Sequence, residues 1–365
     1  MKLLLVISAV FLLAQAKVEK PHHQAKASKV RSHFNEPTPP TLEIGDEDYA
    51  DPDNEKAILA RSAALENGGD LGHHLFGIMS TLGIARRLGR KPIFALRAPY
   101  FKQASSNALW DLARNFPGLI PPQSIDVKHT YGKNFWPAGE DDLKLSGCCR
   151  FVDPEKSLKN KDRATVRFEG GYLQSYKYFQ PYRGELNEKL LGNEALFTKM
   201  SQSLVSQEAL GPDVERICIH TQRGSFLGNY HQASTFTFVR AAAQEVEGDN
   251  SIILLFGDDK TWMKQLAQKL DADGFDVEVA GKDGVPRVSE LFFFRQYCDK
   301  VVISASSSTF GWWAAYFSQM KRAHVPVFYN QGFAKDPTYV AQLKAEDYYL
   351  PGWKALGLPN GTDDN

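Results

Sequence analysis

The C-terminal half of this 365-residue chain predicts a doubly wound α/β domain with a mostly parallel sheet. Two observations lead to this class. Short apolar runs recur along the chain, and amphipathic helical segments separate them at a spacing that suits one crossover helix each. Such sheets bind ligands at the carboxyl ends of their strands, so the residues that follow each strand are the candidates for a binding site.

The alternation can be followed element by element. We expect five buried strands, at 216–220, 251–256, 275–279, 300–304 and 325–329, and four helices, at 235–246, 260–270, 288–297 and 310–319. The run Ser-Ile-Ile-Leu-Leu-Phe at 251–256 is strongly β-prone and typical of a strand buried on both faces.

The N-terminal half is less regular. Apolar residues between 74 and 88 fall on one broad helical face, and Gly89 follows as a typical helix end. Residues 92–96 then predict a buried strand. The glycine-rich loop at 67–72 matches neither a P-loop nor the dinucleotide fingerprint, for which we expect no suitable strand upstream. The aromatic stretch from about 100 to 190 gives no secure assignment.

The first residues predict entry into the secretory pathway. Lys2 precedes an apolar run at 3–14, which ends in the small-x-small pattern of a cleavage site. This run is shorter than the about 20 residues that span a membrane. We expect a signal peptide at 1–16, with a short uncleaved anchor as the alternative. Residues 17–55 are rich in charged residues, His and Pro, which predicts a flexible stem.

The charge balance excludes one broad class of partner. Lys plus Arg and Asp plus Glu both total 43, so the formal net charge is zero. A general nucleic-acid binder usually has a basic excess, and we expect no nucleic-acid partner. Any anion that this protein binds must be held by a local site.

Four cysteines permit two disulfides in an oxidising compartment, with three pairings. We do not expect the neighbours Cys148 and Cys149 to pair with each other, because that ring is strained. Cys218 and Cys298 lie in or beside predicted core elements. Buried free thiols are the alternative. Asn360 begins a glycosylation sequon near the C-terminus.

Two strand ends have candidate ligands for phosphate or ribose. Arg223 stands beside Gly224 after the strand at 216–220, and a guanidinium can bind two phosphate oxygens at once. A surface arginine in a turn is the alternative. Asp258 and Asp259 follow the strand at 251–256. A divalent metal, ribose hydroxyls, a guanine edge and a helix cap are all open as their partners.

A run of small hydroxyl residues at 304–309 opens the helix at 310–319. The free amides of a helix start, with the positive end of its dipole, form a phosphate site that needs no metal. A Ser or Thr cap with no further role is the alternative. We expect Trp312 and Trp313 to pack in the core in either case.

Five segments, taken in order, resemble the alpha-1,2-fucosyltransferases of glycosyltransferase family 11. The first resembles the family's Gly-x-Leu-Gly-Asn loop and helix, and the others its Gly-Tyr-x-Gln-Ser, His-x-Arg-Arg-Gly-Asp, Ser-Asp-Asp-x-x-Trp and Thr-Phe-Gly-aromatic-Trp-Ala-Ala motifs. The resemblance covers about 66 to 330, and these segments lie at 69–76, 171–179, 220–225, 257–262 and 309–315.

This resemblance implies two facing Rossmann-like lobes of the GT-B-like kind. GDP-fucose, a co-substrate with no further cofactor, would be held mainly by the lobe at 206–350, and the acceptor by the lobe at 56–205, leaving a tail at 351–365. It implies an inverting, metal-independent transfer of fucose to the 2-hydroxyl of a galactose-containing glycan. The location would be the Golgi lumen or outside the cell, with membrane attachment only if the N-terminal segment stays uncleaved.

The resemblance also implies a set of site residues, with no metal ligands among them. The amides at Ser308 and Thr309 and the Arg223 guanidinium would stabilise the diphosphate. The general base is open between His73, His220 and Glu169. The donor site would comprise Gln222, Arg223, Gly224, Asp258, Asp259, Ser308, Thr309, Phe310 and Gly311, with Gly69, Gly72 and His73 in the nearby loop.

Four residues depart from the family pattern. Gln222 and Ser225 replace an Arg and an Asp, His73 replaces an Asn, and Asp70 stands where the family often has Arg. A carboxylate near a diphosphate costs roughly 1–4 kcal/mol. A catalytically silent relative that binds glycan or nucleotide is therefore an alternative. An unrelated nucleotide-dependent oxidoreductase is a third hypothesis, which the missing dinucleotide fingerprint and the signal segment oppose.

Overall fold

The computed structural model describes residues 56–62, 69–95, 111–120, 125–126, 143–145, 148–159, 165–170 and 172–361. They belong to one compact unit, 46–365. The predicted signal peptide at 1–16 and stem at 17–55 lie outside the described residues. Across the described ranges, no helix has the length and apolar character needed to cross a membrane.

A six-stranded parallel sheet forms the C-terminal part, in the order β11-β10-β9-β6-β7-β8. The chain builds outward from β6 in one direction and then returns to build outward from β9 in the other. The prediction of a doubly wound parallel sheet is confirmed. The strands are β6 (Glu215–Thr221), β7 (Ser251–Gly257), β8 (Val277–Val279), β9 (Lys300–Ile303), β10 (Val327–Asn330) and β11 (Lys354–Leu356).

The edge strand β11 lies within the segment expected to be a tail from residue 351. It pairs with β10 through Phe328 and Lys354 and the two residues that follow each of them. The residues at 354–356 are therefore part of the sheet, and the C-terminal lobe continues past residue 350. Its three residues include only one buried apolar side chain, which explains why hydrophobic pattern alone does not identify it.

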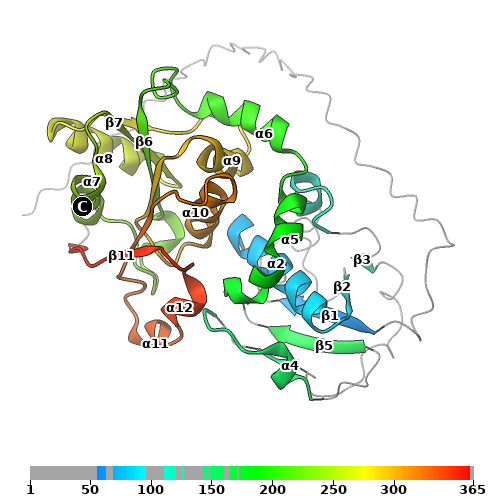
Figure 1. Cartoon of the computed structure of the whole chain (residues 1–365). Coiled ribbons are helices and arrows are strands. Elements are labelled where there is room, and N and C mark those ends of the chain that lie inside the picture. Colours follow the sequence, from blue (N-terminus) through cyan, green and yellow to red (C-terminus); the bar gives the residue numbers. More distant parts are fainter. Residues whose placement is uncertain are drawn as a thin grey trace, which may run out of the picture. The chain divides into compact units, whose positions relative to one another are not determined.

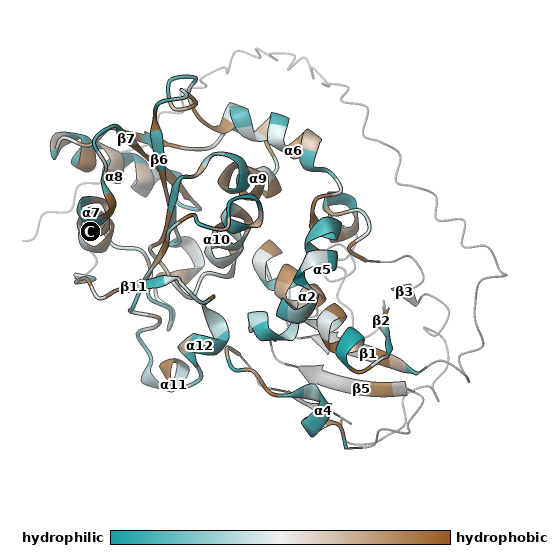
Figure 2. Ribbon diagram, viewed as in Figure 1, coloured by the Kyte–Doolittle hydropathy of each residue, from teal (hydrophilic) through white to brown (hydrophobic). Residues whose placement is uncertain are grey.

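Helices cover both faces of this sheet. Alternate residues of β6 point to opposite faces, so Ile217 and Ile219 pack with α7 (Phe236–Val246) and α8 (Lys260–Ala272). Cys218 belongs to the core on the other face, with α9 (Val288–Tyr297) and α10 (Thr309–Lys321). Figure 2 shows hydrophilic and hydrophobic residues side by side on α8, as expected for a helix with one face in solvent.

A second parallel sheet lies in the N-terminal part, in the order β3-β2-β1-β5-β4. The helix α2 (Leu71–Arg87) connects its strands β1 and β2. The strand β1 ends at Ser62, ahead of the glycine-rich loop, in a region where we expected no strand suited to the dinucleotide fingerprint. The strands are β1 (Ala57–Ser62), β2 (Lys91–Ala95), β3 (Ile125–Asp126), β4 (Leu143–Lys144) and β5 (Thr165–Gly170).

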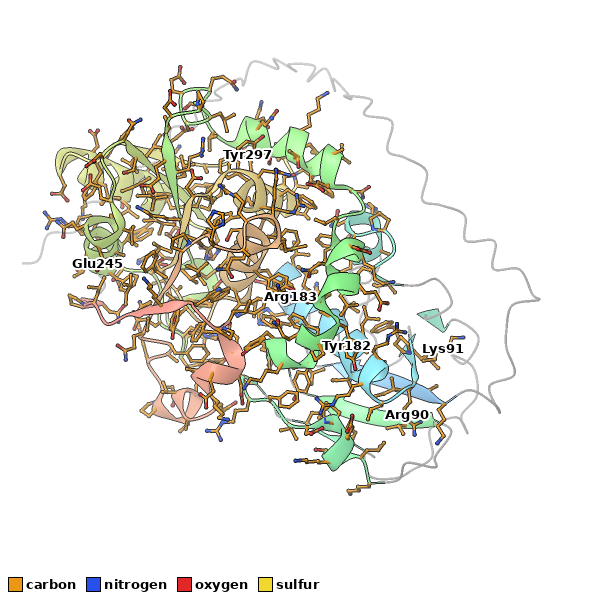
Figure 3. All side chains as sticks on the ribbon, viewed as in Figure 1. Arg90, Lys91, Tyr182, Arg183, Glu245 and Tyr297 are labelled. Atoms are coloured by element: carbon orange, nitrogen blue, oxygen red, sulfur yellow. A yellow bond between two sulfur atoms is a disulfide. The ribbon has the colours of Figure 1, made fainter. Side chains whose placement is uncertain are left out.

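Shorter elements fill the connections. They are α4 (Pro154–Ser157), η3 (Tyr176–Tyr178), η4 (Gln180–Tyr182), α5 (Arg183–Leu190), α6 (Glu194–Ser201), η5 (Gln202–Leu204), η6 (Gly224–Phe226), α11 (Pro337–Val340) and α12 (Ala345–Tyr348). Figure 3 shows Tyr182 and Arg183 where η4 leads into α5. Tyr182 lines a small cavity together with Leu82 and Ala85 of α2, so this segment lies along α2.

The helices α2 and α10 join the two sheets by packing on each other (Figure 1). The Trp313 indole nitrogen donates to the Gly72 carbonyl oxygen at 3.0 Å. The Phe76 ring lies 4.5 Å from the Trp312 ring and 5.1 Å from the Trp313 ring, measured between centroids. The two tryptophans are fully buried, as expected, and they hold the start of α2 against the start of α10.

Two disulfides are present among the described residues. Cys218 pairs with Cys298, and this bond links β6 to the end of α9. Cys148 pairs with Cys149, so the expectation that these neighbours do not pair is wrong. Both residues are buried beside Gln174, and Cys148 also contacts the Tyr339 hydroxyl. The expectation rested on the strain of the ring that two neighbouring cysteines form. The sequence pattern does not predict the buried packing around this pair.

Substitution of Gly72 should weaken the α2–α10 contact. A Cβ atom at this position would lie 2.5 Å from the Phe310 amide nitrogen, and backbone on both sides prevents an easy shift. We expect Gly72→Ala to lower the free energy of unfolding by about 1–3 kcal/mol, measured by urea denaturation. Gly184→Ala is the matched control, because Gly184 is an exposed helical glycine with open space around it. Equal stability of the two variants would contradict this packing.

Candidate functional site

The point where the strand order reverses lies between β6 and β9, and polar side chains lock the two strand ends together. The Ser304 hydroxyl donates to the His220 carbonyl oxygen at 2.8 Å. The hydroxyls of Ser234 and Ser304 lie 2.7 Å apart, and Ser234 accepts from the Gln222 amide at 2.9 Å. All of these side chains are buried. A crevice at such a reversal is where doubly wound sheets bind ligands.

The start of α10 faces this reversal. The Ser308 hydroxyl caps the helix by accepting from the Gly311 amide at 3.3 Å. The Ser308 amide donates to the Ala305 carbonyl oxygen and is not available to a ligand. The amides of Thr309 and Phe310 stand at the first two helical positions, where no acceptor exists within the helix. Together with the helix dipole they favour an anion.

Arg287 places a positive charge beside this helix start. It precedes α9, and its guanidinium carbon lies 4.1 Å from the centre of the Phe310 ring. Its Nη2 is buried and has no hydrogen-bond partner among the described residues. Sequence reasoning missed Arg287. Arg287 stands between the strand predicted at 275–279 and the helix predicted at 288–297. It therefore also follows a predicted strand, which is the criterion that identified Arg223.

Arg223, the predicted phosphate ligand, is held at the end of β6. Its Nη1 donates to the Ser234 carbonyl oxygen at 2.7 Å, and its guanidinium carbon lies 4.6 Å from the Trp262 ring centre. The side chain is buried at the carboxyl edge of the sheet. Gly224 and Ser225 follow it in η6 and are exposed. Trp262 therefore positions this cation by stacking.

The paired aspartates have different structural roles. Asp259 caps α8 by accepting from the Trp262 amide at 2.9 Å, which is the capping alternative. Asp258 accepts from the Arg223 amide at 2.9 Å and from the Gln222 side-chain amide at 2.5 Å. The oxygen of the Gln222 side-chain amide, Oε1, is buried without a partner in the described part of the chain. Gln222 thus keeps one acceptor available at the site.

Asp70, His73 and Thr309 form a polar cluster where α2 meets α10. Asp70 Oδ1 caps α2 by accepting from the His73 amide at 3.1 Å, and it lies 2.8 Å from His73 Nδ1. The Thr309 hydroxyl is 3.2 Å from each of these two side-chain atoms. Burial alone would raise the pKa of Asp70, but His73 and the charge of Arg287 hold it below its usual range. Asp70 is therefore a carboxylate.

The remaining base candidates differ in their access to solvent. His220 is fully buried, with neither ring nitrogen hydrogen-bonded among the described residues. Burial and the charge of Arg287 lower its pKa to about 3. Glu169 lies in β5, and its side chain is outside the described residues. Gly69 precedes α2 directly, and Gly311 lies against the His220 ring, where a Cβ atom would be 2.6 Å from Nδ1.

A second group that sequence reasoning missed lies behind the anion site. Glu290 of α9 is almost fully buried, and its Oε2 has no partner among the described residues. Burial raises the pKa of Glu290, and burial lowers that of Lys260, whose Nζ donates to the Ala280 carbonyl oxygen. The unpaired oxygen of Glu290 can accept a hydrogen bond from a ligand. No periodic pattern distinguishes it from an ordinary helical glutamate.

Asn360, the glycosylation candidate, is half-buried near β10. Its Oδ1 accepts from the Asn330 side-chain amide at 2.5 Å. This bond leaves the Asn360 nitrogen, the atom that a glycan would modify, near Gly332. Elsewhere in the described ranges, no group of three or more His, Cys, Asp or Glu residues is placed to hold a metal ion.

Comparison with known proteins gives a consistent set of relatives. The model of glycosyl transferase family 11 matches residues 165–357. A galactoside 2-alpha-L-fucosyltransferase of Caenorhabditis elegans is 28% identical over 299 residues, covering 80% of this chain and 78% of that protein. Another C. elegans protein of the same name is 26% identical over 351 residues, covering 86% and 81%.

Among solved structures, the fucosyltransferase NodZ from Bradyrhizobium aligns with a TM-score of 0.40 and 12% identity. The alignment covers 71% of this chain and 91% of that chain.

The buried histidine makes stability depend on pH in a defined direction. A histidine that is neutral when folded and protonates when unfolded destabilises the fold as pH falls below about 6.5, by about 1.4 kcal/mol per pH unit. Because burial lowers the pKa of folded His220 to about 3, the folded protein keeps this histidine neutral, and the loss of stability continues as the pH falls from about 6.5 toward 3. We expect His220→Phe to reduce the slope of unfolding free energy against pH by about 1.4 kcal/mol per unit between pH 6 and 4. Equal slopes of unfolding free energy against pH for the variant and the wild type, measured by urea denaturation, would contradict a buried neutral His220.

Proposed function

The chain belongs to glycosyl transferase family 11, and from this membership we propose that it transfers fucose from GDP-fucose to the 2-hydroxyl of a galactoside with inversion. Two C. elegans relatives that cover about four-fifths of the chain are named galactoside 2-alpha-L-fucosyltransferase. The reaction joins a new carbon–oxygen bond at the anomeric carbon while the bond to the diphosphate breaks, so the site must stabilise negative charge on the leaving GDP.

The observation that carries this proposal is the unpaired guanidinium nitrogen of Arg287 beside the start of α10. Its Nη2 is buried without an acceptor among the described residues, and the Thr309 amide stands at the first position of the same helix. A diphosphate placed there would receive charge-assisted hydrogen bonds from Arg287 and the positive end of the helix dipole. Positive charge for the leaving group is thus supplied by the chain itself, and the proposal includes no metal ion.

The nucleoside would lie beside the ends of β6 and β7. Asp258, Gln222 and Glu290 bring oxygen acceptors to this side of the sheet. A carboxylate suits the adjacent N–H groups of a guanine edge or the two hydroxyls of a ribose. Asp258 is already bonded to Gln222, so Glu290 and Gln222 Oε1 are the acceptors that still need a partner among the described residues.

The acceptor and the location follow from the same proposal. We propose a galactose-containing glycan as acceptor and the lumen of the secretory pathway, in the Golgi or beyond, as the place of action. The apolar segment at 3–14 with its cleavage pattern supports this location. Membrane attachment depends on whether that segment is cleaved.

One observation favours a second candidate, a silent relative that binds its ligand without turnover. The Asp70 carboxylate accepts a hydrogen bond from the Thr309 hydroxyl at the start of α10, close to the proposed diphosphate. Its negative charge opposes that of the ligand. His73 and Arg287, which both stabilise the Asp70 carboxylate, reduce this repulsion.

Turnover of GDP-fucose by the purified chain separates these candidates. The full chain is incubated with GDP-fucose, galactosides and a complex glycan mixture in the presence of a chelator. We expect release of GDP together with a new 2-linked fucose. Saturable GDP-fucose binding without turnover would indicate the silent relative. A folded protein that neither binds nor turns over GDP-fucose would contradict the proposed donor.

Removal of the unpaired guanidinium should weaken GDP binding. We expect Arg287→Ala to raise the Kd for GDP by about 10- to 100-fold, because a lost hydrogen bond to a charged group costs about 1.5–3 kcal/mol. Titration calorimetry measures this change. Arg240→Ala is the matched control, because Arg240 lies on α7 in an exposed ion pair with Asp273. Equal GDP affinity of the two variants would show that Arg287 does not contact the diphosphate.

A further inference from the structure

We propose that His73, oriented by Asp70, is the general base that removes the proton from the acceptor hydroxyl. This inference rests on the proposed function and adds a catalytic residue to it. The proton of the 2-hydroxyl passes to Nε2 of His73 as the acceptor oxygen forms its bond to the anomeric carbon. The electron pair of the breaking carbon–oxygen bond leaves with the diphosphate, so GDP departs and His73 later returns its proton to solvent.

The geometry of Asp70 fixes both the position and the tautomer of the imidazole. One carboxylate oxygen, Oδ1, holds the His73 backbone amide at 3.1 Å and the ring Nδ1 at 2.8 Å. Because Asp70 is a carboxylate, Nδ1 carries the proton and Nε2 keeps its lone pair. Helix α2 thus presents a histidine whose ring is held from two sides. This is the arrangement in which a carboxylate orients a catalytic imidazole.

Nε2 of His73 is accessible. The side chain of His73 is 30% exposed, and no hydrogen bond from the described residues reaches this nitrogen. Asp70 and the Thr309 hydroxyl both contact Nδ1, so Nε2 is the ring nitrogen that remains for a ligand. A base and a leaving group must act on opposite sides of the sugar in an inverting transfer. An acceptor hydroxyl bonded to Nε2 would therefore have to attack the face of fucose opposite the diphosphate.

The other histidines near the site are less suited to this role. Both nitrogens of His220 are sealed from solvent, and Nε2 of His74 is buried without a partner in the described residues. His231 uses Nδ1 to bond the Ser307 hydroxyl at 2.9 Å, and its ring stacks on Phe226. Burial lowers the pKa values of His74 and His231 to about 4, which makes both of them weak bases.

An aromatic surface lies beside His73 and suits the apolar face of a sugar ring. The Tyr172 ring is 5.3 Å from the His73 ring. Tyr230 is 41% exposed and lies 4.5 Å from Tyr339. Aromatic rings with polar tips bind ligands that have both apolar and hydrogen-bonding surfaces. We place the acceptor galactose on this side of His73.

Backbone strain next to Tyr172 fits a functional position. Leu173 has a φ of 50°, and it is the one non-glycine residue with positive φ among the described residues. Such a conformation costs about 1–2 kcal/mol in a residue with a bulky side chain. The Ser80 hydroxyl holds it by donating to the Leu173 carbonyl oxygen at 2.8 Å. Strain of this kind is retained where surrounding structure fixes it, and it is frequent at active sites.

The test compares His73→Ala, Asp70→Asn and the wild type in the full chain. We expect His73→Ala to lower kcat for transfer by about 100-fold or more, the usual contribution of a general base. GDP affinity should stay within about threefold of wild type, and added imidazole should restore activity at least tenfold. Asp70→Asn keeps the helix cap but offers the wrong hydrogen-bond pattern to Nδ1, so we expect kcat to fall about 10- to 100-fold.

A pH profile provides the second readout. The acidic limb of kcat against pH in the wild type should disappear in His73→Ala. The charged and titratable groups around His73, namely Asp70, His74, Tyr172, His231 and Arg287, remain in that variant. His324→Gln is the control, because His324 is exposed between α10 and β10 and should leave kcat unchanged.

Each outcome supports or overturns the role of His73 as the general base. A wild type that turns over GDP-fucose, with a His73→Ala variant above one-tenth of its kcat or insensitive to imidazole, would overturn the role of His73 alone. A wild type that binds GDP-fucose without any turnover would overturn the transferase proposal and this inference together. If His73→Ala does not fold, the Asp70→Asn variant, which keeps the helix cap, replaces it in the test. An unchanged kcat in that variant would overturn the inference.

Discussion

The contact between the starts of α2 and α10 is the constraint on which both halves of the candidate site depend. Gly72 lies so close to Phe310 that no side chain fits between them, and Trp313 bonds the Gly72 carbonyl oxygen. This packing brings Asp70 and His73 of α2 to Thr309 of α10. The helix start proposed to bind the diphosphate and the His73 imidazole thus lie side by side at the junction of the two sheets.

Opposite charges lie together at this junction. The start of α10 and Arg287 contribute positive potential, and Asp70 contributes a carboxylate at the same place. Asp70 bonds to His73 and Thr309, so part of its charge is already satisfied before a ligand binds. Arg287 Nη2 keeps an unsatisfied donor among the described residues. An anionic ligand can therefore enter a site that contains a carboxylate.

The alternation of apolar runs was enough to predict β6 to β10 and their helices within a few residues, because the central strands are long buried apolar runs, whereas the edge strand β11 has one buried residue and was missed. The strand ends likewise led to Arg223, Asp258 and Thr309. Sequence reasoning missed β1 and β5, which are short and not strongly periodic, and it missed Glu290, whose role depends on tertiary contacts. It also missed Arg287, although this residue follows a predicted strand. It also treated Asp70 and His73 as separate departures from a family pattern, although the two side chains bond each other.

A crystal structure of the complex with GDP tests the central claim most directly. The account predicts the diphosphate at the start of α10, within hydrogen-bond distance of Arg287 Nη2 and of the Thr309 amide, with Nε2 of His73 open to the acceptor. A diphosphate bound elsewhere on the sheet edge, with Arg287 still unpaired and the Asp70 carboxylate filling the helix start, would contradict it.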